Sequence, residues 1–271
     1  MVGGVPFWAW VVGVAVVAIT TVFMLAPLVV VMGASFSAGG YLAFPPQGLS
    51  LRWYGVVFGS EDYLSAALLS LRVGLAVMVI SVLVGSAAAA ALTRFRFAGA
   101  EALQSLFLSP LILPTIVFGI GMLMLFSRAF DGPSIWALIT GHVIITLPYV
   151  VRTVGAVMAG IDPATEEMAQ VMGARWWQRY LYIVLPQCRA GILAGAFFAF
   201  TISFDDAVVA IFLRGPDTET LPIKIYTELE FTTDPSVAAV STLLILLTLL
   251  IALLIERLLG LAAILRRHGH A

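Results

Sequence analysis

Six long apolar stretches dominate the sequence and leave little choice of fold. Each has about 20 residues or more, enough to cross the roughly 30 Å hydrocarbon core of a bilayer as an α-helix. None of them alternates between apolar and polar residues, as strands of a membrane barrel do. Only 11% of the residues are charged, against about 25% in an average soluble domain. The sequence therefore predicts an all-α membrane protein, a single domain over residues 1–271 with spans at residues 7–32, 64–92, 103–126, 135–158, 190–213 and 237–259.

The distribution of basic residues predicts how these spans are oriented. Cytoplasmic segments of membrane proteins carry the excess of Lys and Arg. If the N-terminus lies inside, nine arginines fall on inner segments and four basic residues on outer ones. Both termini and the loop of residues 159–189 are therefore expected in the cytoplasm. The inner set is Arg94, Arg96, Arg152, Arg175, Arg179, Arg189, Arg257, Arg266 and Arg267, and the outer set is Arg52, Arg128, Arg214 and Lys224.

The loop of residues 159–189 is the one long polar interruption between the predicted spans. Asp162 is placed to cap a short helix, and Gly173 is placed to end it. A second short helix, Trp176 to Tyr182, is expected to end before Pro186. The loop also carries apolar side chains although it is too charged to lie in lipid, so we expect another protein to cover them. These side chains are Met168, Val171, Met172, Trp176, Trp177 and Leu181.

The same loop resembles the EAA loop of binding-protein-dependent ABC transporter permeases. The pattern of that family reads EAA-x3-G-x9-I-x-LP, and this sequence departs from it only where Met168 replaces the first alanine. The alternative, an amphipathic helix on the inner leaflet, would carry more basic residues on its polar face. The resemblance implies the type I fold of ABC importer permeases, with this loop as the coupling helix that docks on a cytoplasmic ATPase subunit. The residues that carry the match are Glu167, Met168, Ala169, Gly173, Ile183, Leu185 and Pro186.

The last third of the chain carries a narrower resemblance. The runs Thr201 to Asp206, Gly215-Pro216, Leu221 to Tyr226 and Asp234-Pro235 are similar to the spermidine/putrescine branch of those permeases. This resemblance implies that the solute is a polyamine or a related cationic compound. Opine and iron permeases share parts of the same runs, so an opine-like solute remains an alternative.

Two acidic residues near the end of the fifth predicted span are the candidates for a substrate path. A carboxylate at the centre of a span costs about 2.5 to 3.5 kcal/mol on insertion scales, so Asp205 and Asp206 are expected to face a cavity or a partner. Arg72 lies at a similar depth in the second span, and one interpretation is a purely structural ion pair between Arg72 and one aspartate. The other is that the aspartates attract a cationic solute. His142, in the fourth span, is expected to be a packed histidine and not a proton relay or metal ligand.

The sequence contains no Walker A loop of the form GxxxxGKS/T and no metal-ligand cluster, so no cofactor is expected and ATP and Mg²⁺ would be bound by a partner. The resemblance implies two cytoplasmic ATPase subunits, a related but non-identical second permease, an extracytoplasmic binding protein and no nucleic acid, in a bacterial inner membrane. The alternatives are a gradient-driven secondary transporter that uses Asp205, Asp206 and His142, and a membrane enzyme. The first leaves the apolar loop unexplained, and the second lacks a nucleophile and base at catalytic spacing.

Overall fold

The structure is a computed structural model that describes residues 7–231 and 234–268. Within these residues the regular structure is helical, apart from one isolated bridge between Ser37 and Leu49. The helices are α1 Phe7–Ser35, α2 Arg52–Gly59, α3 Glu61–Arg94, α4 Ala100–Leu108, the 3-10 helix η1 Ser109–Leu111, α5 Thr115–Ala129, α6 Ile135–Ala159, α7 Pro163–Val171, α8 Trp176–Arg179, the π-helix η2 Tyr180–Val184, α9 Leu185–Gln187, α10 Arg189–Asp205, α11 Val208–Leu213, α12 Leu221–Phe231 and α13 Ser236–His268.

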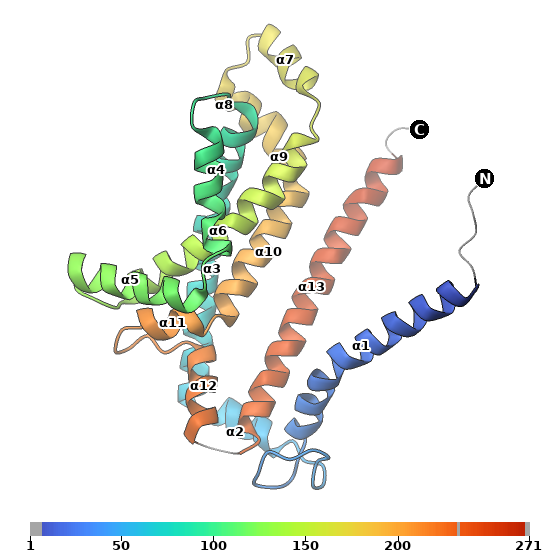
Figure 1. The fold of residues 1–271 in the computed structure, drawn as a ribbon, viewed down its shortest axis with the longest axis vertical. Helices are drawn as coiled ribbons and strands as arrows, with labels where there is room; N and C mark the ends of the chain where they lie inside the picture. Colours follow the sequence, from blue (N-terminus) through green and yellow to red (C-terminus); the bar gives the residue numbers. More distant parts are fainter. Residues whose placement is uncertain (1–6, 232–233, 269–271) are drawn as a thin grey trace. The chain divides into compact units, whose positions relative to one another are not determined.

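The chain forms two compact units (Figure 1). One unit comprises Met1–Glu61 and Thr227–Leu249, and the other comprises Asp62–Tyr226 and Leu250–Ala271. In the first unit, Trp53 Nε1 donates a hydrogen bond to the Ser37 carbonyl at 3.0 Å, and the Tyr54 hydroxyl lies 2.7 Å from Ser35 Oγ. These bonds fix the loop that joins α1 to α2.

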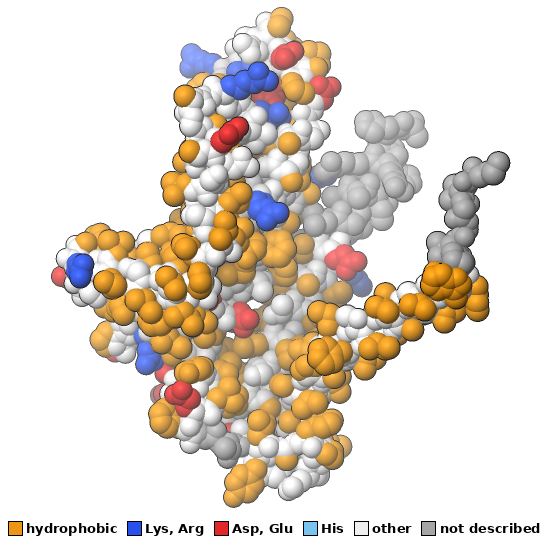
Figure 2. Space-filling model, in the orientation of Figure 1, with side chains coloured by type: hydrophobic (Ala, Val, Ile, Leu, Met, Phe, Trp, Pro, Cys, Tyr) orange, Lys and Arg blue, Asp and Glu red, His pale blue; other side chains and the backbone are white. Residues whose placement is uncertain are grey.

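Four described helices are long and apolar enough to cross a membrane: α1, α3, α6 and the segment Ser236–Arg257 of α13. They coincide with four of the predicted spans, and the all-α prediction is confirmed. Two further candidates are pairs of helices with a bend between them, so the count is four, or six if each bent pair is one span. The central part of α1 buries none of its side chains, and apolar side chains cover it in Figure 2.

The third predicted span, residues 103–126, is broken. The segments Ala100–Leu111 and Thr115–Ala129 differ in direction by 105°, and Figure 1 shows α5 turning away from α4. The break falls after Pro110 and at Pro114, which directly precedes α5. Proline lacks the N–H that would continue the helical hydrogen bonds. The prolines therefore end one helix and begin another, where the sequence predicts only a kinked span.

The fifth predicted span, residues 190–213, is also interrupted. α10 ends at Asp205, and α11 begins at Val208 after extended backbone at Asp206. At its other end α10 follows the helical segment Trp176–Gln187 with a bend of 74°. The interruption places both candidate aspartates at the end of α10.

The second unit is held together by close helix packing around α6. A Cβ added to Gly191 on α10 would lie 2.6 Å from the Thr153 carbonyl oxygen. A Cβ added to Gly85 on α3 would lie 2.7 Å from Val150 Cγ1. Small residues thus let α3 and α10 approach α6 closely, as in many membrane bundles. An apolar core that includes Leu138, Val209 and Leu213 fills the space beside them.

Candidate functional site

The loop of residues 159–189 begins with a helix whose two ends are set by local sequence. The Asp162 carboxylate accepts a hydrogen bond from the Ala164 N–H at 3.0 Å and caps α7. At the other end Gly173 has a φ of +88°. The Gly173 N–H bonds to the Gln170 carbonyl and the Ala174 N–H to the Ala169 carbonyl, each at 2.9 Å. This paired arrangement is a Schellman motif, which favours glycine, and both sequence predictions are confirmed.

The second half of the loop differs from the prediction. The Arg175 N–H donates to Gln178 Oε1 at 2.8 Å at the start of α8, and helical structure then continues through η2 to Gln187. The prediction that it ends before Pro186 is wrong. The π turn η2 comes directly before the α9 residues Leu185 and Pro186. Its wider ring relieves the clash that a proline ring makes with the carbonyl of the preceding α-helical turn.

The loop exposes most of its apolar side chains. Val171 and Met172 are 89% and 88% exposed, and Met168, Trp176, Trp177 and Leu181 are exposed as well. The expectation of an uncovered apolar surface is therefore confirmed. Among the residues that match the EAA pattern, Glu167, Met168, Gly173 and Pro186 are exposed, whereas Ala169, Ile183 and Leu185 are partly buried. Charged side chains gather around α7 and α8 on the face shown in Figure 2.

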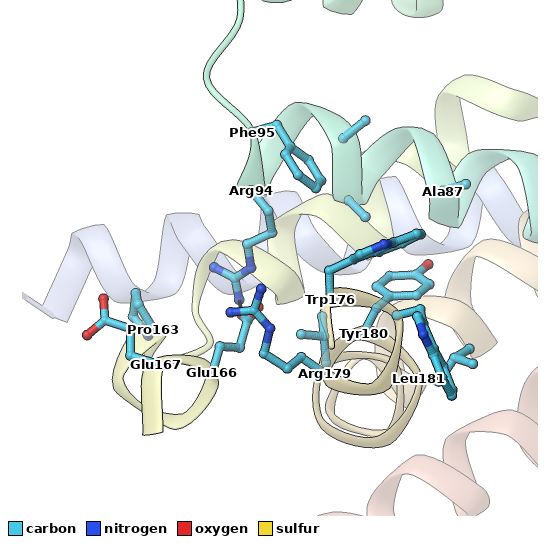
Figure 3. A pocket seen from close by; sticks show the side chains of 14 residues that line it. Ala87, Arg94, Phe95, Pro163, Glu166, Glu167, Trp176, Arg179, Tyr180 and Leu181 are labelled. Carbon is cyan, nitrogen blue, oxygen red and sulfur yellow. Dashed lines mark ion pairs between the residues drawn. The ribbon is translucent and has the colours of Figure 1, made fainter. Parts of the chain in front are cut away.

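A cavity of about 570 Å³ lies between this loop and the end of α3. Its lining is largely apolar and includes Trp176, Tyr180 and Leu181. Figure 3 shows Arg94 from α3 and Arg179 from α8 pointing toward Glu166. Arg179 donates a hydrogen bond to Gln170 Oε1, which links the two halves of the loop.

An ion pair joins the loop to α3. Arg94 Nη2 lies 2.9 Å from Glu166 Oε1, and each side chain is only 19% exposed. Glu167 points away from this pair in Figure 3 and is exposed. The pair was not predicted from the sequence. The available signal was a basic residue in the last turn of one helix and an acidic residue in the first turn of another, which suit the helix dipoles but name no partner.

The two aspartates near the end of α10 have different surroundings. Asp206 Oδ2 accepts hydrogen bonds from the N–H groups of Val209 at 2.8 Å and Ala210 at 3.3 Å, in the first turn of α11. The same oxygen lies 3.5 Å from His142 Nε2. Asp205 is the last residue of α10 and is exposed. Asp206 therefore has a structural task, while the Asp205 side chain is accessible.

An ion pair between Arg72 and an aspartate, one of the two interpretations of the sequence, is not formed in the part of the chain that the structure describes. Arg72 is exposed, whereas its neighbours Val73 and Val77 are 1% and 0% exposed. Adjacent residues on a helix point about 100° apart, so burial of the Val73 face turns Arg72 outward.

His142 is fully buried, as expected for a packed histidine, and its Nδ1 lies 2.9 Å from Ser203 Oγ. Its acidic neighbour Asp206, distant in sequence, was not predicted. The described residues contain no cluster of three or more potential metal ligands.

Comparison with known proteins identifies the family. Residues 81–262 match the family described as binding-protein-dependent transport system inner membrane component. The chain is 31% identical over 231 residues to the spermidine/putrescine transport system permease protein PotC of Escherichia coli K12, covering 85% of this chain and 87% of PotC. It is 30% identical over 230 residues to the putrescine transport system permease protein PotI of the same strain, covering 82% of each.

The fold also matches solved structures. A crystal structure of a bacterial alginate ABC transporter, in complex with an alginate-bound periplasmic protein, aligns with a TM-score of 0.74. The alignment covers 92% of this chain and 93% of that one at 17% sequence identity. At this identity the match shows the fold alone. The chain therefore belongs to the family of binding-protein-dependent transport system inner membrane components, and it is a permease subunit of an ABC importer with the type I fold.

Proposed function

We propose that this permease imports a polyamine, such as spermidine or putrescine, or a related cationic solute. The observation that carries the proposal is the similarity to PotC and PotI over more than four fifths of the chain. An opine-like solute is the alternative to test. The gradient-driven alternative is set aside, because the chain is a subunit of an ABC importer.

Permeases of this fold work with ATPase and binding-protein partners. In our proposal the whole chain is one permease domain in a bacterial inner membrane, with both termini in the cytoplasm. It pairs with a related, non-identical permease and with two ATPase subunits, which bind the ATP and Mg²⁺. An extracytoplasmic binding protein delivers the solute. The sequence supports this division of labour, because it contains no phosphate-binding loop of the Walker A type.

The loop of residues 159–189 is proposed to dock on an ATPase subunit. Its support is the exposed apolar surface, in which Met168 and Met172 offer flexible side chains that adapt to a partner groove. Glu167, Ala169 and Gly173, with Ile183, Leu185 and Pro186, belong to the same docking segment. When the two ATPase subunits close on each other, the docked loop would then move with them. Such rigid-body movement of subunits about an interface occurs in other switching proteins.

Asp205 is the proposed contact for the cationic solute. It is the last residue of α10, and the carboxyl end of a helix carries a partial negative charge that favours cations. Its neighbour Asp206 already accepts two N–H groups of α11. Arg72 is exposed and forms no described ion pair, so it leaves the charge of Asp205 unneutralised. Arg72 remains a candidate residue of the substrate path, where its positive charge would repel a cationic solute.

Uptake into proteoliposomes that hold the assembled transporter tests both parts of the proposal. With loaded binding protein at saturating concentration, spermidine and putrescine should be imported, and unlabelled opines should compete poorly for loading and uptake. Asp205→Asn is expected to lower the uptake rate at least about tenfold, because a charge-assisted contact contributes about 1.5 to 3 kcal/mol. Asp131→Asn is the matched control, since Asp131 is also exposed but lies in the turn after α5. A normal rate for Asp205→Asn would remove this residue from the path.

A further inference from the structure

The ion pair between Arg94 and Glu166 joins two segments that the chain does not connect directly. Arg94 is the last residue of α3, and Glu166 lies in the first turn of α7. Their side chains meet at 2.9 Å and are mostly buried. We propose that this pair is the strut through which movement of α7, the first helix of the docking loop, is passed to α3. The inference rests on the proposed docking function of residues 159–189.

α7 has little other means of moving α3. None of its residues is buried, so it does not transmit displacement through a packed face. Its one other described side-chain link to another helix is the hydrogen bond between Gln170 and Arg179, which stays within the loop. The short segment from Gly160 to Asp162 connects α7 covalently to α6. The second half of the loop reaches α3 by another route, because Val184 and Cys188 lie in one buried cluster with Ala89 and Ala90. The ion pair is therefore the described side-chain contact that ties α7 itself to α3.

α3 is suited to carry such a movement across the membrane. Its 34 residues contain no proline and correspond to a length of about 51 Å at 1.5 Å per residue. Ser81 Oγ lies 2.8 Å from Thr146 Oγ1 on α6, and both side chains are buried. Further along, Ser70 Oγ accepts a buried hydrogen bond from the Leu221 N–H at the start of α12, at 2.8 Å. A shift at Arg94 thus reaches α6 and the far end of the unit through fixed contacts.

The two adjacent glutamates of α7 consequently have different tasks. Glu166 faces inward to Arg94, whereas Glu167 is exposed and points away from the pair, as Figure 3 shows. Glu167 is free to meet a partner, and Glu166 ties the same helical turn to the membrane helix. Removing either charge of the inner pair leaves the other charge without its partner in a mostly buried position.

The test measures the amount of solute imported per ATP hydrolysed by the assembled transporter in proteoliposomes. Arg94→Gln and Glu166→Gln are each expected to lower this ratio at least about fivefold while the ATPase subunits stay bound and active. The double variant Arg94→Glu with Glu166→Arg should recover much of the ratio. Recovery should be incomplete, because the exchanged charges no longer suit the helix dipoles. Arg96→Gln is the matched control, an exposed arginine with no described ion pair.

The outcomes separate the strut from the docking proposal. An unchanged ratio in both single variants overturns the strut. It is also overturned if both variants release the ATPase subunits and the charge exchange does not restore the ratio, since the pair would then only shape the loop. Docking is tested separately by the double variant Glu167→Gln with Val171→Asp on the exposed surface. If this double variant keeps the ATPase subunits bound and imports solute at the full rate, the docking proposal fails, whatever the amount of solute imported per ATP in the other variants.

Discussion

His142 links several polar groups in the interior of the described chain. Its imidazole is fully buried, contacts Ser203 Oγ at 2.9 Å and lies 3.5 Å from the carboxylate of Asp206. Its carbonyl accepts a hydrogen bond from Thr146, which also contacts Ser81. The contacts form a polar chain from α3 through α6 to the end of α10. Because unpaired polar groups are costly in an apolar core, such a chain favours one arrangement of these helices.

Replacement of His142 by leucine should destabilise the protein. Leucine has a similar volume but leaves the Ser203 hydroxyl and the Asp206 carboxylate without this partner. We expect a loss of about 1 to 3 kcal/mol in the free energy of unfolding, measured as a drop of several degrees in melting temperature in mild detergent. Ser105→Ala is the control, because the Ser105 hydroxyl is exposed and bonds only to the carbonyl of Glu101 in its own helix. Equal melting temperatures for the two variants would contradict a stabilising role of the buried contacts.

Single residues also show where sequence-based prediction succeeds and where it fails. The cap at Asp162 and the end of α7 at Gly173 were predictable, because both depend on chemistry within a few residues. The Arg72 ion pair was one of two interpretations left open, and it is not formed among the described residues, because depth in the membrane does not determine which face of a helix turns inward. The contact of His142 with Asp206 was missed for a related reason. It depends on the break between α10 and α11, which brings together residues that are 64 positions apart.

At the scale of elements, glycines with positive φ offer a matched comparison. Gly173 in the docking loop and Gly132 in the turn after α5 have φ values of +88° and +92°. A Cβ added to either would find no atom within 4 Å. The two sites therefore differ in location and not in local crowding. Substitution at both carries a similar backbone penalty, since a β-branched residue rarely adopts positive φ.

Gly173→Val is expected to disrupt the Schellman motif and displace the exposed surface that follows α7. The ATPase subunits should then no longer co-purify in mild detergent, and uptake should fall to background. Gly132→Val should show a comparable loss of melting temperature yet retain the ATPase subunits. Equal retention by both variants would mean that the shape of the loop end is unimportant for docking.

The broken spans show a second limit of prediction at this scale. Proline identified the weak points of the third predicted span, but the 105° change of direction depends on what receives α5. A Cβ added to Gly119 on α5 would lie 2.6 Å from the ring of Phe212 on α11. This close packing of α5 against α11 is a tertiary contact. A sequence pattern that marks where hydrogen bonds are lost does not reveal where the freed helix goes.

At the scale of the whole molecule, the orientation in the membrane decides whether the docking loop and the ATPase subunits lie on one side. Family membership and apolar helices establish a multi-pass inner-membrane permease. The excess of arginine on one set of loops supports cytoplasmic termini. Two turns that are predicted to lie on opposite sides of the membrane allow this orientation to be measured. Ala98 lies between α3 and α4 and Asp131 follows α5, and both side chains are exposed.

Cysteine labelling provides the measurement because the chain has a single cysteine, Cys188, which is fully buried. The parent protein should stay unlabelled by a membrane-impermeant maleimide, in intact and in permeabilised spheroplasts alike. Asp131→Cys should react in intact spheroplasts, whereas Ala98→Cys should react only after permeabilisation. The reverse pattern would put the loop of residues 159–189 outside the cell, where no ATP-hydrolysing partner could reach it. Because Ala98 lies four residues beyond Arg94, the same result would locate the proposed strut on the cytoplasmic side, next to the subunits that hydrolyse ATP.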